Sequence, residues 1–277
     1  MAVHDTLLWQ PDRVATHRPL VIAHRGASAQ QPEHTLAAYT EAIKVGADGL
    51  ECDVRLTADG HLVCVHDRSV RRTSNGRGRV STLELTDLEG LDWGSWKARQ
   101  DSGDEEPDVV TTDERSHLLT LKKLLSLVAD TDRRIQVAIE TKHPTRYGGL
   151  VERRLTDLLE HFGWAGDPEG PVRVMSFSLL AVRRMRQLAP AVPRVFLMKQ
   201  VPLPFRDGSL PPGVDTAGIA VPILRRHPGY VQRVRDRGNR VFVYVVDDLA
   251  DVDLCLAAGV HAIITNRPAE VLEHMRR

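Results

Sequence analysis

The chain has 277 residues, and its 37 Lys and Arg residues balance its 37 Asp and Glu residues, so the formal net charge is zero. A balanced chain has no global basic field, which argues against charge-driven binding of nucleic acid or anionic lipid and favours small-molecule partners. The length fits one large domain or two small ones.

The chain starts with MAVHDTLLWQPDRVATHRP, in which no basic stretch is followed by a long apolar run. This start predicts neither a signal peptide nor a stable membrane anchor. Three cysteines, Cys52, Cys64 and Cys255, show no CxxC spacing and are too few for a disulfide framework, which is typical of a reducing compartment. We predict a cytoplasmic protein, and its oligomeric state stays open.

Short apolar runs rich in β-branched residues recur along the chain and alternate with amphipathic segments of helical length. The eight runs are LVIAH (20–24), GLECDV (49–54), IQVAIE (135–140), VRVMSF (172–177), RVFLM (194–198), GIAVP (218–222), VFVYVV (241–246) and AIIT (262–265). This alternation is typical of βα units and a parallel sheet. Eight parallel strands favour a (β/α)8 TIM barrel of the α/β class, although the spacing also allows a doubly wound open sheet.

One further run, HLVCVH (61–66), follows the second predicted strand after only a few residues. A parallel neighbour needs a crossover of roughly a dozen residues, so this run must be antiparallel. With Asp59-Gly60 as the turn, it predicts a β-hairpin insertion after the second strand that returns His66 towards Asp53.

We expect residues 1–277 to form a single domain, because no linker or internal repeat interrupts the pattern. Residues 68–120 are expected to be a loop-rich insertion, which includes an acidic, solvated segment at 101–117. The Pro-rich loop 200–215 follows the fifth strand and lies on the face where barrels build active sites. It either shapes the substrate entrance or simply connects two elements.

Polar side chains gather at the predicted strand ends, where a barrel builds its active site. They are His24, Arg25, Glu51, Asp53, Glu140 and Lys142, and the hairpin adds His66 and Asp67. Three converging carboxylates would repel one another and raise their pKa values unless a cation neutralised them. Oxygen ligands suit a hard ion, so we predict a site for Mg²⁺ or Ca²⁺, with Mn²⁺ as a further option, rather than for zinc.

The remaining strand-end residues suit phosphate ester chemistry. Arg25 and Lys142 would bind anionic phosphate oxygens, and a guanidinium does so in a bidentate manner. His24 and His66 would serve as a general acid and base pair, because an imidazole titrates near pH ~6.5. A pair of histidines of this kind favours an enzyme over a binding module.

Some of these residues have structural alternatives. Glu51 and Asp53 can instead form a structural salt bridge with Arg25 or Arg55. Glu33 can cap the helix that follows it or interact with Arg25. We favour the metal site over the structural salt bridge, because three buried carboxylates without a neutralising cation would destabilise the fold.

The motifs HRGASAQQPEHT, ECD, VHD, ETK, SFS, VYVVDD and GVHAIITNRP occur in this order over almost the whole chain. Together they resemble the glycerophosphodiester phosphodiesterase family, and in particular its bacterial cytoplasmic members. The resemblance implies a TIM barrel that uses a divalent metal to hydrolyse glycerophosphodiesters to sn-glycerol 3-phosphate and an alcohol. By position it implies His24 and His66 as catalytic residues, Glu51, Asp53 and Glu140 as metal ligands, and Arg25 and Lys142 as phosphate contacts. We add Glu33, Phe177 and Tyr244 as substrate-binding residues, the two aromatic residues as pocket walls or else as core.

The chain departs from the family pattern at two places. His34 stands in PEHT where the family usually has PENT, and Asp247 stands in YVVD where the family often has WTVN. His34 can hydrogen-bond as Asn would, or contact the substrate. Asp247 adds a negative charge near the end of the seventh predicted parallel strand, so the resemblance does not define the details of substrate binding at this position.

Two other functions stay open at this point. The first is a lysophospholipase D-like activity on lysolipids, which predicts a preference for long acyl chains. The second is a non-catalytic phosphosugar-binding barrel, since a fold does not fix a function. The nucleophile, either water or the glycerol hydroxyl of the substrate, is also left open.

Overall fold

The computed structural model describes residues 18–97 and 116–277. The predictions for the start of the chain and for residues 101–115 of the acidic segment therefore lie outside the described residues. Within the described ranges, no helix combines the length and the apolar composition that crossing a membrane requires.

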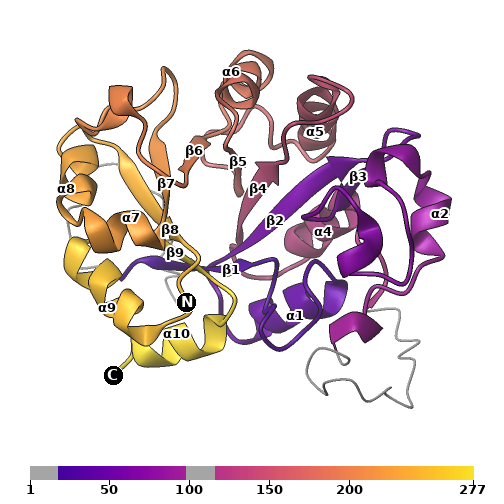
Figure 1. The fold of residues 1–277 in the computed structure, drawn as a ribbon, viewed down its shortest axis with the longest axis horizontal. Helices are drawn as coiled ribbons and strands as arrows, with labels where there is room; N and C mark the ends of the chain where they lie inside the picture. The colour runs from indigo at the N-terminus through magenta and orange to yellow at the C-terminus, as the bar shows by residue number, and fades with distance from the viewer. Residues whose placement is uncertain (1–17, 98–115) are drawn as a thin grey trace, which may run out of the picture.

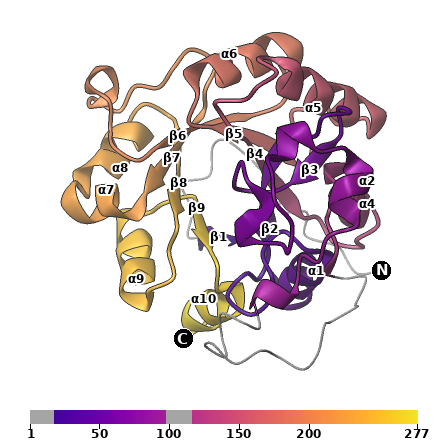
Figure 2. The same ribbon diagram turned by 45° about the vertical axis from the view of Figure 1, so that its right-hand side comes forward.

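The parallel strands form a closed barrel. They are β1 (Leu20–His24), β2 (Gly49–Leu56), β4 (Gln136–Thr141), β5 (Val172–Ser176), β6 (Arg194–Met198), β7 (Thr216–Ala220), β8 (Arg240–Tyr244) and β9 (Ala262–Thr265). Hydrogen-bonded neighbours follow the order β1-β9-β8-β7-β6-β5-β4-β2, and β2 pairs with β1 to close the ring. The predicted (β/α)8 barrel is confirmed, and the open-sheet alternative is wrong (Figure 2).

Helices surround the strands (Figures 1 and 2). They are α1 (Leu36–Lys44), α4 (Leu121–Ala129), α5 (Leu150–His161), α6 (Leu179–Leu188), α7 (Val221–Arg226), α8 (Gly229–Arg235), α9 (Leu249–Ala258) and α10 (Pro268–His274). Thr35, Thr120, Ser178 and Asp248 begin four of them by accepting a backbone N–H through the side chain, which stabilises each start by about 1 kcal/mol. Their apolar faces bury side chains against the outside of the barrel.

Two predicted strands extend too far. The run 241–246 passes the end of β8 at Tyr244. The run 218–222 is predicted to be extended throughout, whereas β7 spans Thr216–Ala220 and α7 begins at Val221. Pro222 lies in the first turn of α7, where its missing N–H and fixed φ suit a helix start. The end of β7 and the start of α7 are both buried and apolar. The hydrophobic pattern of the sequence therefore does not change where the strand ends and the helix begins.

The predicted hairpin is present. Strand β3 (Leu62–Cys64) runs antiparallel to β2, with Val54 opposite Cys64, and the turn contains Gly60 at φ 90°. Beyond it lie the short helices η1 (Val70–Arg72), η2 (Val80–Thr82) and α2 (Leu85–Glu89). This insertion has a small core of its own, made of buried Val63, Val65, Val70, Val80, Leu88, Trp93 and Leu118. In Figure 1 its helix α2 lies beside β3.

Candidate active site

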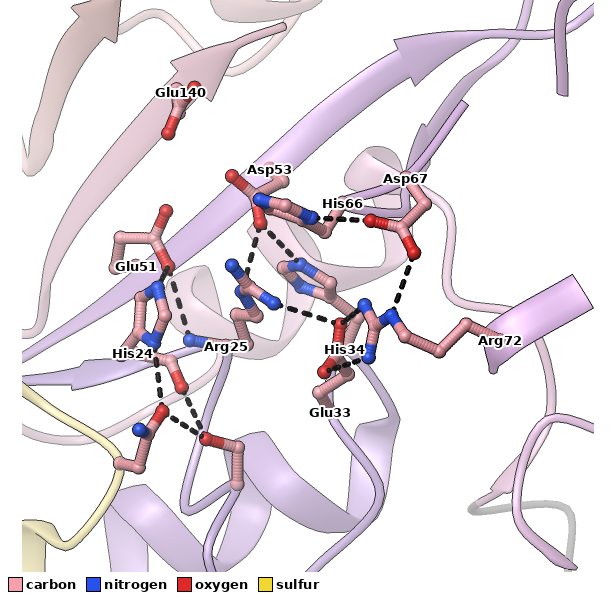
Figure 3. A network of polar contacts seen from close by, with 12 residues as sticks. His24, Arg25, Glu33, His34, Glu51, Asp53, His66, Asp67, Arg72 and Glu140 are labelled. Atoms are coloured by element: carbon pink, nitrogen blue, oxygen red, sulfur yellow. Dashed lines mark hydrogen bonds and ion pairs between the residues drawn. The ribbon is translucent and has the colours of Figure 1, made fainter. Parts of the chain in front are cut away.

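Two strand registers bring the three predicted metal ligands together at the C-terminal end of the barrel. His24 lies opposite Glu51 in the β1–β2 pair, and Asp53 lies opposite Glu140 in the β2–β4 pair. Glu51, Asp53 and Glu140 each offer a carboxylate oxygen, and these oxygens all lie within 4.8 Å of one another. The three residues are only 2%, 1% and 7% exposed. Figure 3 shows them beside His24 and His66.

The donor set of this cluster fits a hard divalent cation. Burial and the charge of Asp53 raise the pKa of Glu51 well above its usual value and raise the pKa of Glu140 to about 7. Asp53 Oδ1 is buried and accepts no hydrogen bond among the described residues. Carboxylate oxygens are the ligands that Mg²⁺ and Ca²⁺ prefer, and such an ion would relieve the repulsion between these acids.

Two cations of the protein also contact Asp53. Lys142 Nζ lies 2.8 Å from Asp53 Oδ1 and 2.8 Å from Glu140 Oε1. The contact with Asp53 Oδ1 is an ion pair that lacks the geometry of a hydrogen bond. Arg25 Nε lies 3.1 Å from Asp53 Oδ2. Burial opposes ionisation of Asp53, but a hydrogen bond from His34 and the charges of Lys142 and Arg25 lower its pKa well below the usual value. Asp53 is therefore the carboxylate of the cluster that stays charged.

Of the two arginines considered as structural salt-bridge partners of Glu51 and Asp53, Arg25 contacts these residues and Arg55 is bonded elsewhere. The backbone N–H of Arg25 donates to Glu51 Oε2 at 3.1 Å, and its side chain faces Asp53. Arg55 instead donates from Nε and Nη2 to the backbone oxygen of His66, at 2.9 and 2.7 Å. Arg25 thus pairs with the acidic cluster, whereas Arg55 anchors the end of the hairpin.

His24 lies between a neutral amide and the acidic cluster. Its Nδ1 lies 2.8 Å from Asn266 Oδ1, and its Nε2 lies 3.9 Å from Glu51 Oε2. Burial and the charge of Arg25 lower the pKa of His24 to about 4. The ring is therefore neutral at pH 7.

His66 has a carboxylate as its partner instead. Its Nδ1 lies 2.6 Å from Asp67 Oδ1, and Arg72 Nε donates to the other oxygen of Asp67 at 2.7 Å. Burial lowers the pKa of His66, while the charge of Asp53 opposes this shift. The hairpin therefore brings a second imidazole beside Asp53, as Figure 3 shows.

Glu33 does not cap the following helix, because Thr35 caps α1 through its own hydroxyl. It accepts a hydrogen bond from Arg25 Nη1 at 3.1 Å and two from Arg72, at 2.8 and 2.7 Å. Burial opposes ionisation of Glu33, but the bonds from Arg72 and the charge of Arg25 lower its pKa to about 2. The second of its two predicted roles, an interaction with Arg25, is the one that the contacts favour.

His34 makes two buried hydrogen bonds. Its Nε2 lies 2.9 Å from Asp53 Oδ2, and its Nδ1 lies 2.8 Å from the hydroxyl of Tyr39. His34 and Arg25 both adopt a left-handed backbone, at φ 60° and 58°, which is uncommon for residues other than glycine. The departure from PENT thus places an imidazole behind a predicted metal ligand.

Phe177 and Tyr244 lie at the ends of β5 and β8, away from the carboxylates in sequence. Their rings meet edge to face with centroids 5.9 Å apart. Phe177 is 37% exposed, and Lys199 Nζ lies 5.5 Å from its ring centroid. The hydroxyl of Tyr244 donates to the backbone oxygen of Met198 at 2.8 Å. Phe177 is the more accessible of the two predicted pocket walls.

Sequence reasoning missed two residues that hold the site. Asn266 follows β9 directly, so the strand-end argument that found His24 applies to it as well. Arg72 lies in the insertion, and no pattern in the sequence marks it. Asp247, the second departure from the family pattern, accepts hydrogen bonds through its carboxylate from Thr265 and Asn266.

Comparison with solved structures supports the fold. A phosphodiesterase of Oleispira antarctica, solved in complex with the product sn-glycerol-3-phosphate, superposes with a TM-score of 0.79 at 24% identity, covering 94% of this chain and 98% of the other. A glycerophosphodiester phosphodiesterase of Agrobacterium tumefaciens has a TM-score of 0.71 at 26% identity, covering 92% and 99%.

Sequence comparison gives the family. "Probable glycerophosphodiester phosphodiesterase 1" of Mycobacterium tuberculosis is 47% identical over 95% of this chain and 94% of its own length. A glycerophosphodiester phosphodiesterase of Bacillus subtilis is 32% identical, over 94% and 86%. The predicted family and enzyme class are thereby confirmed. Since the model of the glycerophosphoryl diester phosphodiesterase family also matches residues 24–270, the chain belongs to that family.

Proposed function

We propose that this chain hydrolyses glycerophosphodiesters to sn-glycerol 3-phosphate and an alcohol, with a divalent cation held by Glu51, Asp53 and Glu140. The observation that carries the proposal is the convergence of these three buried carboxylates within 4.8 Å, beside two histidines. Mg²⁺ and Ca²⁺ suit the oxygen ligands best, and Mn²⁺ is the third ion to test. When bound, such an ion acts as a Lewis acid on a phosphoryl oxygen.

Arg25 and Lys142 are the proposed phosphate contacts. Both lie against Asp53, so their charges reach the side of the cluster where an anionic ester would bind. Glu33 holds the guanidinium of Arg25 in place through its 3.1 Å contact. We assign Phe177 and Tyr244 to the walls that contact the rest of the substrate, supported by their positions at strand ends.

The two histidines differ in their partners, which supports different roles. Asn266 is neutral and faces His24 Nδ1, so His24 suits a base that takes a proton at Nε2 from the attacking hydroxyl, whether of water or of the substrate. Asp67 is a carboxylate and faces His66 Nδ1, so it favours the imidazolium against the burial that lowers the pKa of His66. His66 would then give the proton at Nε2 to the departing alkoxide as the phosphorus–oxygen bond breaks.

A change of leaving group tests this assignment. The alkoxide of an ordinary alcohol needs a proton, whereas p-nitrophenolate does not. His66→Ala should therefore lose at least about 100-fold in kcat on glycerophosphocholine, but much less on a glycerophosphodiester of p-nitrophenol. His24→Ala should lose similar factors on both substrates. Equal losses for the two variants on both substrates would contradict the division of roles.

The activity itself is tested by a substrate panel with the metal varied. We expect release of sn-glycerol 3-phosphate from glycerophosphocholine and glycerophosphoethanolamine with Mg²⁺, Ca²⁺ or Mn²⁺, and none in excess chelator. Full activity in chelator would count against the metal site. Faster turnover of lysophosphatidylcholine would instead favour the lysophospholipase D-like alternative, and binding of these diesters without any turnover would favour the phosphosugar-binding barrel.

We also infer that the protein works in the cytoplasm. The three cysteines, Cys52, Cys64 and Cys255, are all buried and unpaired, which suits a reducing compartment. Fractionation of cells that express the full chain would test this, and recovery of the protein from a secreted or membrane fraction would contradict it.

A further inference from the structure

Asp247 and Asn266 meet just beyond the ends of β8 and β9. Asp247 Oδ1 accepts hydrogen bonds from Thr265 Oγ1 at 2.9 Å and from the backbone N–H of Asn266 at 2.8 Å. Asp247 Oδ2 accepts from Asn266 Nδ2 at 2.5 Å. Because an ionised carboxylate can only accept, these bonds leave the Asn266 amide one orientation, with its nitrogen towards Asp247 and its oxygen away from it.

The oxygen of this amide faces His24. Asn266 Oδ1 lies 2.8 Å from His24 Nδ1, and since an amide oxygen has no proton to give, the imidazole must carry a proton on Nδ1 for this hydrogen bond to form. The hydroxyl of Ser28 lies 2.8 Å from the same amide oxygen and 2.8 Å from the backbone oxygen of His24, so it has only acceptors to donate to. Nε2 is then the ring nitrogen that can accept or release a proton, and it lies 3.9 Å from Glu51 Oε2.

We propose that Asp247 and Asn266 are positioning residues for His24: the carboxylate orients the amide, and the amide fixes the tautomer that leaves Nε2 free to accept a proton. This inference rests on the proposed function, in which His24 is the base. It also gives a role to the departure from WTVN, because the negative charge of Asp247 is used by three donors that hold the end of β9.

An exchange of the two side chains tests the proposal. Asp247→Asn removes the constraint on the amide, and Asn266→Asp places two carboxylates side by side. We expect kcat on glycerophosphocholine with saturating Mg²⁺ to fall about 10-fold or more in each single variant, with KM within about twofold. In D247N/N266D, the new amide at 247 donates to the new carboxylate at 266, which still accepts from His24 Nδ1. The carboxylate restores the tautomer but also stabilises the imidazolium, as Asp67 does for His66, so we expect kcat of this double variant to exceed that of either single variant by at least about threefold without fully reaching the wild-type value.

Asp248→Asn is the matched control. Asp248 follows Asp247 directly but accepts from the backbone N–H of Ala250 at 3.0 Å, at the start of α9. We expect this variant to lower the melting temperature slightly and to leave kcat unchanged. An exchanged double variant no more active than the single variants, or single-variant losses confined to KM, would overturn the proposal.

A second readout needs no turnover and no metal. In protein labelled with ¹⁵N at histidine and kept in chelator, the His24 signals, assigned by their loss in His24→Gln, report which ring nitrogen carries the proton. We expect the Nδ1–H tautomer in the wild type, a mixture in D247N and the Nδ1–H form again in the double variant. An Nε2–H tautomer in the wild type, or identical spectra of the wild type and D247N, would refute the positioning role. If the wild type hydrolyses no glycerophosphodiester, the proposed function fails, but this measurement still decides the present inference.

Discussion

Arg72 and Glu33 form a bidentate ion pair that joins the insertion to the loop before α1. Arg72 Nη1 donates to Glu33 Oε2 at 2.8 Å, and Nη2 donates to Oε1 at 2.7 Å. The same guanidinium donates through Nε to Asp67. One side chain therefore connects Glu33, which holds Arg25, with Asp67, which holds His66. The insertion thus supplies a clamp that holds two parts of the active site together.

Replacement of Arg72 by Lys should disable this clamp while keeping the charge. An ammonium cannot make the parallel bonds of a guanidinium, so the loss is about 1–2 kcal/mol, which corresponds to about a 5- to 30-fold fall in kcat/KM. Steady-state kinetics on glycerophosphocholine measures it. Arg71→Lys, at the exposed neighbouring position, is the control and should keep full activity. An R72K enzyme as active as this control would show that the clamp is dispensable.

Glu51→Gln should separate stability from metal binding. The raised pKa of Glu51, caused by burial and by Asp53, means that its ionised form is destabilised without a cation, so a neutral amide should cost little in chelator. With Mg²⁺ at about 100 times its dissociation constant, the wild type should gain about 2.7 kcal/mol, seen as a rise of about 5–10 °C in melting temperature. E51Q should show no rise.

The half-buried carboxylate of Glu41, on α1 and outside the acidic cluster, provides the control, and E41Q should respond to Mg²⁺ as the wild type does. A melting temperature of E51Q that rises with Mg²⁺ as far as that of the wild type would place the ion elsewhere.

Much of this architecture could be predicted, because period and spacing are local properties of the sequence. The parallel strands and the antiparallel β3 follow from apolar runs and their separations. The acidic cluster follows from the residues at strand ends, since Asp53 and Glu140 belong to neighbouring strands in register. A barrel topology is enough to bring such residues together.

The supporting contacts could not be predicted in the same way. Arg72 reaches Glu33 across 39 positions of the chain, through an insertion whose path no periodicity specifies. The orientation of the Asn266 amide depends on which side chain lies on its nitrogen side, and only the pairing of β8 with β9 decides that. Residues at strand ends are thus readable from the sequence, whereas the residues that orient them depend on three-dimensional packing.

Substitutions of His34 should separate backbone strain from lost hydrogen bonds. Asn adopts the left-handed backbone more readily than other non-glycine residues, whereas a β-branched residue is a true outlier there. Since His34 lies at φ 60°, we expect H34N to be within about 1–2 kcal/mol of the wild type in urea unfolding. H34V should cost about 2 kcal/mol more than H34A, which lacks the hydrogen bonds but has no branched side chain. Equal stabilities of H34V and H34A would argue against strain at this position.

His261 should make the protein less stable in mild acid. Its Nδ1 accepts the backbone N–H of Val241 at 3.1 Å, which requires an unprotonated nitrogen. Burial and the charges of Arg240, Arg235 and Arg173 lower its pKa to about 4. Between the unfolded pKa of about 6.5 and the folded value, the unfolded chain binds the proton more tightly, so the free energy of unfolding falls as the pH falls through this window.

Chemical denaturation at pH 7.5 and at pH 4.5 measures this contribution. His261→Asn keeps an acceptor oxygen but no titrating group, so it should lose about 1 kcal/mol less than the wild type between the two pH values, a figure reduced because the ring is only partly buried. His227→Asn removes an exposed imidazole and is the matched control. If H227N and H261N changed the pH dependence equally, burial of His261 would not be the cause.

Phe177 and Tyr244 should differ in their effects on the substrate, although both were predicted as pocket walls. The hydroxyl of Tyr244 is already bonded to the backbone oxygen of Met198, so Tyr244→Phe should cost about 1 kcal/mol of stability and leave KM for glycerophosphocholine within about twofold. Phe177 is 37% exposed and offers its ring to a ligand, so Phe177→Ala should raise KM about 5- to 10-fold through the loss of about 1 kcal/mol of ring contact. Leu188, 38% exposed at the end of α6, is the control, because L188A removes an apolar side chain of similar exposure. A KM that rises in L188A as much as in F177A would assign the effect to general surface hydrophobicity rather than to a wall of the substrate pocket.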